Sequence, residues 1–346
     1  MIRDAELKLL AELCAAATRG QPHQASDQRY DWDRLIRLAK RHRVQGLAWL
    51  GLTGGTEITP PEAPGLFEDA KSIARQNLLA AAAAARMKGA FDRRGLALVF
   101  LKGLTLGALA YSNTMLKMSA DLDVLVDPAE IEAAEECLLR LDYEPEGERR
   151  TMSRRGAAAK EWPWVGSDGI VLDLHVRLAD NPALLPAIGA RSPTQDMEVS
   201  PGITLPTFRN EELFAYLCVH GASSAWFRLK WVADFAAFLG RFSPDEVRRL
   251  YQASHAFGAG RCPDVALLVA EEFFGPFAPR DVLASAARDP IARLLAGLSK
   301  RELVQVREPL ERPLGTAAIH FAQLFMGRGV RFPLREFGRQ VSNVLA

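Results

Sequence analysis

Patterns typical of β-strands are confined to the middle of the chain. Apolar residues run through 95–101, polar and apolar residues alternate through 122–126, and two further strand-like segments cover 158–165 and 169–177. The turn sequence Gly-Ser-Asp-Gly separates the last two segments. The middle of the chain is therefore predicted to form a small unit of mixed helix and strand.

Both ends of the chain have helical patterns instead. Apolar residues recur at a helical period from 32 to 47, and an alanine-rich segment from 66 to 94 has high helix propensity. After Pro206 helical patterns return at 210–220, 226–239, 244–255, 265–274 and 291–306. We therefore expect an α+β protein, with a small mixed-sheet core at 95–206 between a helical region at 1–94 and a second helical region at 207–346.

Length and composition narrow the class of protein. A chain of 346 residues exceeds the usual size of one domain. Its 43 Lys and Arg against 42 Asp and Glu give a net charge of +1, which disfavours a dedicated nucleic-acid binder. The four cysteines stand far apart, so we expect reduced thiols. The most apolar run, at 78–85, is too short to cross a bilayer. These features predict a soluble cytoplasmic protein with no membrane partner.

Two carboxylates stand on one predicted strand. Asp121 and Asp123 are two residues apart, so both side chains point to the same face. Their like charges raise one pKa unless a cation lies between them, and hard divalent cations such as Mg²⁺ prefer carboxylate oxygens. Such pairs are also common at exposed strand ends, so a metal site needs support from elsewhere in the chain.

A third acid provides that support. Asp173 lies among aliphatic residues in the segment 169–177, where an unpaired buried carboxylate would cost several kcal/mol. A metal site shared with Asp121 and Asp123 would supply a partner. His175 faces the same side as Asp173, where it either orients a carboxylate, contacts a phosphate or serves as a hydrogen-bonded structural histidine.

A lysine and a glycine precede these acids. Lys102 and Gly103 lie between a predicted strand and a predicted helix. A glycine allows the backbone to approach an anion, a helix N-terminus offers free N–H groups, and the lysine adds a point charge for a triphosphate. The sequence contains no GxxxxGK[ST] motif, so this is not a Walker-type phosphate loop.

Taken in order, these segments resemble a known family. They are Phe-Leu-Lys-Gly at 100–103, Met-Ser-Ala-Asp-Leu-Asp-Val-Leu-Val at 118–126, the segment 133–143 and Asp-Leu-His at 173–175. They look like the uncharacterised bacterial nucleotidyltransferases of the DNA polymerase β-like superfamily. The similarity also covers His-Arg-Val at 42–44 and the segment 219–234, and so includes most of the chain up to about residue 240.

The resemblance implies a nucleotidyltransferase-like core and an activity. The enzyme would move a nucleoside monophosphate from a nucleoside triphosphate to an acceptor and release pyrophosphate. Asp121 and Asp123 would bind two cations, Mg²⁺ or Mn²⁺, while Asp173 would bind one of them and help to deprotonate the acceptor. The residues expected to bind the nucleotide are Lys102, Gly103, Thr105, Lys117, His175 and Lys230.

The chain departs from the family pattern at two positions. Leu104 stands where the wider superfamily has serine or glycine, and Thr105 is the nearest residue that could supply a hydroxyl. Lys117 stands where relatives often have arginine, and a lysine cannot contact phosphate in a bidentate manner. All three acids are present, so we expect an active enzyme.

Two further segments have alternative interpretations. Lys230 and Asp234 have the spacing of an ion pair on a helix surface, but the same segment could cover the nucleotide, with His220 nearby and Trp226 or Trp231 beside the base. The basic loop at 148–155 either attracts an anionic substrate or is a solvated surface loop.

Two other functions remain open. One is a nucleotide-binding regulatory or partner protein that keeps the fold without turnover. The other is transfer of the γ-phosphate by the same acids and Lys102. The acceptor is open among small molecules, peptides and proteins, and the balanced charge disfavours a long RNA.

Overall fold

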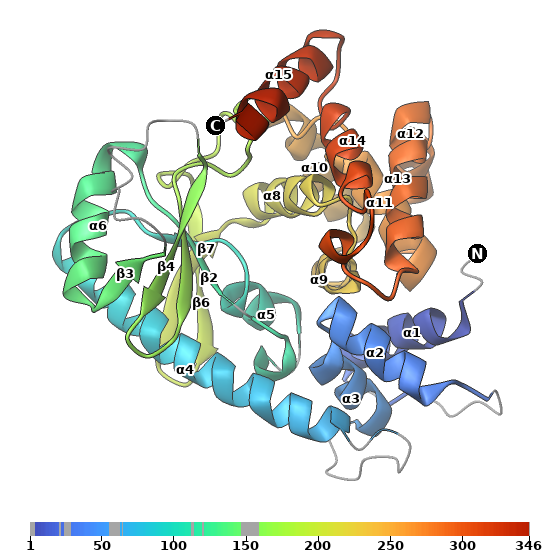
Figure 1. Ribbon diagram of the computed structural model, residues 1–346, viewed down its shortest axis with the longest axis horizontal. Coiled ribbons are helices and arrows are strands. Elements are labelled where there is room, and N and C mark those ends of the chain that lie inside the picture. Colours follow the sequence, from blue (N-terminus) through green and yellow to red (C-terminus); the bar gives the residue numbers. More distant parts are fainter. Residues whose placement is uncertain are drawn as a thin grey trace.

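The computed structural model describes residues 4–20, 22–23, 29–54, 63, 65–111, 114–119, 121–146 and 159–345. It confirms an α+β protein with a small mixed sheet and flanking helices (Figure 1). The N-terminal part consists of α1 (Ala5–Arg19), α2 (Trp32–His42), α3 (Gln45–Thr53) and α4 (Gly65–Arg93).

The central part contains the strands and a few short helices. The strands are β1 (Val99–Phe100), β2 (Leu122–Leu125), β3 (Tyr143–Pro145), β4 (Glu161–Gly166), β5 (Val171–His175), β6 (Thr194–Ser200) and β7 (Ile203–Phe208). The helices are α5 (Leu104–Ala110), α6 (Ile131–Arg140) and the 3-10 turns η1 (Thr114–Leu116) and η2 (Pro128–Glu130).

The C-terminal part is helical. It consists of α8 (Asn210–Ser223), α9 (Leu229–Leu239), α10 (Pro244–Ala256), α11 (Cys262–Phe274), α12 (Arg280–Ala286), α13 (Pro290–Leu303), η3 (Pro309–Glu311), α14 (Ala317–Leu324) and α15 (Arg331–Leu345). Whether 1–94, 95–206 and 207–346 fold as separate domains stays a prediction.

Five strands form the main sheet in the order β1-β2-β5-β4-β3. The central strands β2 and β5 are parallel, and the other neighbours are antiparallel. Strands β6 and β7 form a separate antiparallel hairpin. The parallel pair matters most, because it brings two segments about fifty residues apart in the sequence side by side in register.

One face of the sheet is covered by α4 and α6 (Figure 1). Leu122 and Val124 of β2 and Leu172 and Leu174 of β5 point to this face and are buried. The alanine-rich part of α4 packs here, because small side chains let a helix lie close to a sheet. The alternating residues of β2 and β5 consequently point to the opposite face, toward the C-terminal helices.

The other large apolar core joins the N-terminal and C-terminal helices. It includes side chains of α1, α2 and α3 together with those of α8, α9 and α11. Within the described residues, no helix is long and apolar enough to cross a membrane.

The structure differs from the sequence prediction at some boundaries. The predicted helix 32–47 is two helices, because Arg43 adopts a left-handed conformation that ends α2. The predicted helix 226–239 begins only at Leu229, because Ala225 and Trp226 also have positive φ angles. Strands β3, β6 and β7 were not predicted, since their exposed or mixed residues lack a clean alternation.

Candidate active site

Two aspartates meet at the centre of the sheet. Because β2 and β5 are parallel, Asp123 lies directly opposite Asp173 in the register, and Asp121 precedes Asp123 on the same face. The Asp123 side chain is buried, whereas Asp121 and Asp173 are half-buried. The register thus brings together the three acids that the sequence pattern singles out.

His175 lies one step further along β5. Its Nε2 is 3.3 Å from Oδ1 of Asp123, and its Nδ1 is 3.0 Å from Oε2 of Glu161. Glu161 begins β4 and lies opposite His175 in the antiparallel register. The imidazole is buried between these two carboxylates, which fixes the direction of its ring.

Lys102 lies at the end of β1 and reaches the same group of acids. Its Nζ contacts Oδ2 of Asp123. Burial acts to lower the pKa of Lys102, but the attraction of Asp123 and Asp121 outweighs it and raises that pKa. Burial likewise acts to raise the pKa of Asp123, yet Lys102 and His175 hold it well below its usual range. Lysine and aspartate are therefore both charged at neutral pH.

These residues lie at one side of a cleft of about 370 Å³. Five cations and five acids line it: Arg43, Lys102, Lys160, Arg228 and Lys230, and Asp121, Asp123, Glu161, Asp173 and Asp180. The remaining lining residues are His175, His220, Ser223, Ser224, Trp231, Ile319 and Gln323. Most of the acids come from the sheet, while Arg43, Arg228 and Lys230 come from or adjoin helices opposite it.

The charges on the two sides of the cleft are only partly compensated. Burial and repulsion from Asp123, Asp121 and Glu161 raise the pKa of Asp173 to about 6. On the opposite side, burial and the nearby Lys117 lower the pKa of Lys230 to about 7. A cation near Asp173 and an anion near Lys230 would each relieve this electrostatic cost.

A rigid turn positions Arg228 in the cleft. Trp226 is fully buried at a φ of 52°, and an added Cβ on Gly221 would lie 2.4 Å from its ring. The Phe227 carbonyl accepts a 2.8 Å hydrogen bond from Nη1 of Arg41. Glu308 accepts a 2.9 Å bond from Nη2 of Arg228 itself. The guanidinium is thus held before any ligand arrives.

His42 joins three separate parts of the chain behind this turn. Its Nδ1 accepts a 3.1 Å hydrogen bond from the Leu229 N–H, and its Nε2–H donates a 3.0 Å bond to the Leu303 carbonyl. Burial, reinforced by Arg41, lowers the pKa of His42 to about 3. The imidazole is therefore neutral at physiological pH and holds the start of α9 against the ends of α2 and α13.

The remaining predicted site residues occupy different positions. Gly103 directly precedes α5 with a φ of 68°, a conformation suited to glycine, and lies next to the buried hydroxyl of Ser119, which has no hydrogen-bond partner among the described residues. Thr105 is buried and faces the carbonyls of Phe100 and Lys102, at 3.4 and 3.3 Å. Neither Gly103 nor Thr105 is among the residues that line the cleft.

Lys117 is also separate from the cleft lining. Its Nζ lies 3.3 Å from Oδ2 of Asp234, whose other oxygen accepts a 2.8 Å hydrogen bond from the Tyr111 hydroxyl. Asp234 is therefore engaged by Lys117 and Tyr111, and Lys230 faces the cleft instead. Trp231 also lines the cleft, whereas Trp226 is buried in the protein core. The basic loop at 148–155 lies outside the described residues.

The donor set is suited to a divalent cation. Asp123, Asp173 and His175 each offer a ligand atom, and these atoms lie within 4.8 Å of one another. Carboxylate oxygens suit Mg²⁺ or Mn²⁺, and the imidazole suits a transition metal such as Mn²⁺. Asp121 lines the same cleft but is not part of this group of three. The raised pKa of Asp173 is the property expected of a carboxylate that has no cation beside it.

Sequence reasoning missed several lining residues. Arg43, Glu161 and Arg228 were not assigned to the site, and His220 was only considered as part of a cover. The buried Nε2 of His220 has no hydrogen-bond partner within the described residues. Glu161 could have been found from the predicted strand pair, because it faces His175 there. Arg43 and Arg228 carry no local signal.

Comparison with known proteins adds one finding. A sequence model of the family described as "Uncharacterised nucleotidyltransferase" matches residues 28–275, which include Asp121, Asp123, Asp173 and Lys230. A search of curated proteins finds no match to the chain.

Proposed function

The chain belongs to the uncharacterised nucleotidyltransferase family, and from this premise we propose that it is a metal-dependent enzyme that uses a nucleoside triphosphate. It transfers the nucleoside monophosphate to an acceptor and releases pyrophosphate. The observation that carries the proposal is the cleft in which Asp121, Asp123 and Asp173 face Arg43, Arg228 and Lys230.

The side of the cleft opposite the sheet suits the triphosphate. Arg228 offers a guanidinium that is already fixed in place, and Arg43 lies near enough for the two to repel. The pKa of Arg43 is lowered mainly by burial and then by Arg228. A bound triphosphate would compensate both charges, with Lys102 and Lys230 as additional phosphate contacts. Trp231 provides an aromatic surface for the base.

The sheet side suits the reacting atoms. A divalent cation held by Asp123, Asp173 and His175, with Asp121 lining the same cleft, would supply positive charge next to the phosphate oxygens. Glu161 orients His175 through Nδ1, so that Nε2 faces Asp123.

The transfer is a displacement at the α-phosphorus. The acceptor's nucleophilic atom forms the new bond to phosphorus, and the bond from phosphorus to the α–β bridging oxygen breaks. Pyrophosphate leaves with that oxygen and its electron pair, and an oxygen of Asp173 takes the proton from the acceptor.

Calorimetric titration with each nucleoside triphosphate, with and without Mg²⁺ or Mn²⁺, tests binding. We expect Mg²⁺-dependent binding that is lost in Asp121→Asn/Asp123→Asn. The control Asp33→Asn/Asp196→Asn, which changes two exposed aspartates outside the cleft, should bind as the wild type does. A folded wild-type protein that binds no triphosphate would overturn the proposal.

The products of slow hydrolysis test the reaction type without a known acceptor, because water takes the acceptor's place. Nucleoside monophosphate and pyrophosphate indicate nucleotidyl transfer. Nucleoside diphosphate and phosphate would indicate γ-phosphoryl transfer, and tight binding without any product would favour the regulatory role.

The acceptor is proposed to be a small molecule, a peptide or a protein. Nucleoside triphosphates are cytosolic metabolites, so a cytoplasmic location stays our prediction.

A further inference from the structure

A second cavity, of about 430 Å³, lies between the turn that joins α10 to α11 and the start of α15. Three arginines and one histidine line it: Arg328, Arg331, Arg335 and His255. None of the described residues that line it is an aspartate or glutamate. It shares no lining residue with the catalytic cleft.

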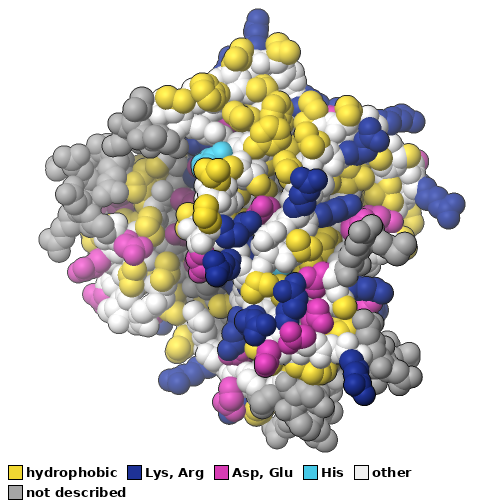
Figure 2. All heavy atoms as spheres, turned by 45° about the vertical axis from the view of Figure 1, so that its right-hand side comes forward, with side chains coloured by type: hydrophobic (Ala, Val, Ile, Leu, Met, Phe, Trp, Pro, Cys, Tyr) yellow, Lys and Arg dark blue, Asp and Glu magenta, His cyan; other side chains and the backbone are white. Residues whose placement is uncertain are grey.

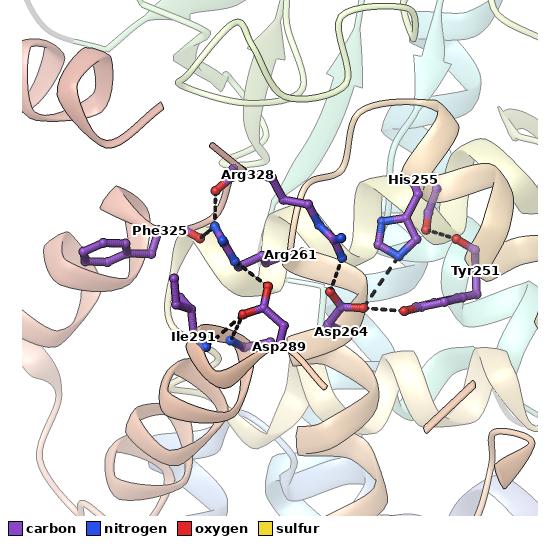
Figure 3. Close-up of polar contacts among 11 residues, drawn as sticks. Tyr251, His255, Arg261, Asp264, Asp289, Ile291, Phe325 and Arg328 are labelled. Carbon is purple, nitrogen blue, oxygen red and sulfur yellow. Dashed lines mark hydrogen bonds and ion pairs between the residues drawn. The ribbon is translucent and has the colours of Figure 1, made fainter. Parts of the chain in front are cut away.

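Arg328 is fixed at the wall by a buried carboxylate. Its Nη2 donates a 2.7 Å hydrogen bond to Oδ2 of Asp264, and the other oxygen of Asp264 accepts a 2.5 Å bond from the Tyr251 hydroxyl (Figure 3). Nε2 of His255 lies 3.6 Å from the same oxygen. The charge of Arg328 is thus compensated by Asp264, and its side chain is held where it lines the cavity.

Arg331 and Arg335 carry uncompensated charge. They lie one helical turn apart on α15, so both project from the same face of the helix, and both are exposed. Within the described part of the chain, neither forms an ion pair. Arg331 also occupies the first turn of α15, where the helix dipole disfavours a cation. The placement of these two cations near the start of α15 lowers the stability of the folded protein, and a bound anion would raise it.

The two walls of the cavity are held together by Arg261. Its backbone N–H donates a 2.6 Å bond to the Met326 carbonyl, its side chain contacts the Gly327 carbonyl, and its Nε donates a 2.7 Å bond to Asp289 (Figure 3). An added Cβ on Gly260 would lie 2.3 Å from the Met326 carbonyl oxygen, so the two segments pack closely. The cavity is therefore preformed rather than assembled by a ligand.

We propose that this cavity binds the phosphate group of a small organic phosphate. Guanidinium groups match the geometry of phosphate oxygens, and Arg331 and Arg335 supply two positive charges that form no ion pair with any described carboxylate. Leu184 and Phe332 line the same cavity and offer apolar surface to the organic part. A volume of about 430 Å³ lies within the range of small-molecule pockets and leaves room beyond a phosphate group.

Titration with inorganic phosphate and with phenyl phosphate, followed by ³¹P NMR line broadening in the presence of EDTA, tests the proposal. Arg331→Gln/Arg335→Gln should weaken binding of both at least tenfold. Arg75→Gln/Arg93→Gln removes the same charge from exposed positions of α4 and should leave binding within twofold of the wild type. The same comparison is repeated in an Arg228→Gln background, which weakens the phosphate contacts proposed for the catalytic cleft, and the tenfold difference should persist there.

The two probes separate the possible sources of the phosphate group. Tighter binding of phenyl phosphate assigns an organic ester, and equal binding assigns inorganic phosphate. The site would be overturned by either of two results. One is equal phosphate affinity in Arg331→Gln/Arg335→Gln and in Arg75→Gln/Arg93→Gln, and the other is that the wild type binds neither probe at millimolar concentration and low salt. Arg331 and Arg335 are exposed and form no ion pair within the described ranges, so circular dichroism should show an intact fold and a melting temperature no lower than that of the wild type.

Discussion

Lys230 occupies a position that is unfavourable for a charged lysine. It is half-buried at the start of α9, and burial together with Lys117 and Lys102 lowers its pKa to about 7. Asp234, one helical turn away, cannot compensate it fully because Lys117 and Tyr111 engage that carboxylate. The free protein is therefore a mixture of charged and neutral Lys230 near neutral pH.

Binding of a triphosphate should consequently take up a proton. At pH 8 most of the free protein has a neutral Lys230, and an anionic ligand raises its pKa, so binding and protonation are coupled. Calorimetry in buffers of different ionisation enthalpy measures this uptake, which should approach one proton. Lys230→Arg keeps the charge and should remove the uptake with affinity within about fivefold. Equal proton uptake in wild type and Lys230→Arg would contradict the role given to Lys230.

At the scale of elements, the turn before α9 determines where the guanidinium of Arg228 lies. The ring of Trp226 fills the space beside Gly221 of α8, and Ala225 and Trp226 both have left-handed backbones. A turn so constrained has little freedom to adjust to an added atom.

Gly221→Ala should therefore displace the Trp226 turn. The new methyl group would lie 2.4 Å from the indole ring, so we expect a loss of about 2 kcal/mol in the free energy of unfolding, typical of overpacking. Triphosphate affinity should also fall, because Arg228 moves with the turn. Urea unfolding and calorimetry measure the two effects.

Gly297→Ala is the matched control. Gly297 lies inside α13 with no atom within 4 Å of an added Cβ. Alanine has the higher helix propensity, so this change should stabilise the protein by up to about 1 kcal/mol and leave binding unchanged. A similar stability change in the two variants would show that the packing against Trp226 is not tight.

The sequence predicted elements well where one physical pattern was dominant. The period-two pattern at 122–126 and the aliphatic segment 169–177 became β2 and β5, and the alanine-rich segment became α4. The prediction was less accurate where backbone conformation overrides periodicity, as at Arg43 and Trp226. No propensity indicates that a non-glycine residue will take a positive φ angle there.

The candidate site was predictable mainly on the sheet side, and on the opposite side Lys230 was predicted. Asp123 and Asp173 lie on regular strands and Asp121 directly precedes β2, so the spacing of these acids predicts a common face. Arg43 and Arg228 come from turns far apart in the sequence, and their meeting depends on tertiary contacts that no local pattern encodes. The roles assigned to all these residues stay predictions until they are tested.

Over the whole molecule, the cleft depends on parts of the chain outside the family match. The matched region ends at residue 275, yet Ile319 and Gln323 of α14 line the cleft and Glu308 holds Arg228.

Figure 2 shows hydrophobic side chains gathered over the upper part of the molecule, where α14 and α15 lie in Figure 1. Exposed residues there include Val330, Leu334 and Phe337.

Stability at low pH should depend on His42, which joins α2, α9 and α13. Its pKa is about 3 in the folded protein and about 6.5 when unfolded, so the unfolded chain binds more protons between these values. The contribution of neutral His42 to the free energy of unfolding is fully present above pH 7 and decreases as the pH falls. By pH 5 the loss of stability amounts to about 2 kcal/mol.

Urea unfolding at several pH values between 7 and 4.5 measures this loss. His42→Gln lacks the titrating ring and should show a shallower loss of stability with falling pH, although it is less stable at pH 7. His320→Gln, at an exposed position of α14, should keep the wild-type pH dependence. The same slope in all three proteins would rule out His42 as the titrating group.

The contacts of His42 and Arg228 also determine when, during synthesis of the chain, the cleft can first be completed. A ribosome releases α2 and the acidic strands before Leu303, Glu308 and the cleft-lining residues of α14. Domains fold as the chain is released from its N-terminus onward. The nascent chain therefore carries its carboxylates before the opposing side of the cleft is complete, and the proposed binding of a nucleotide should begin only once translation has delivered α14.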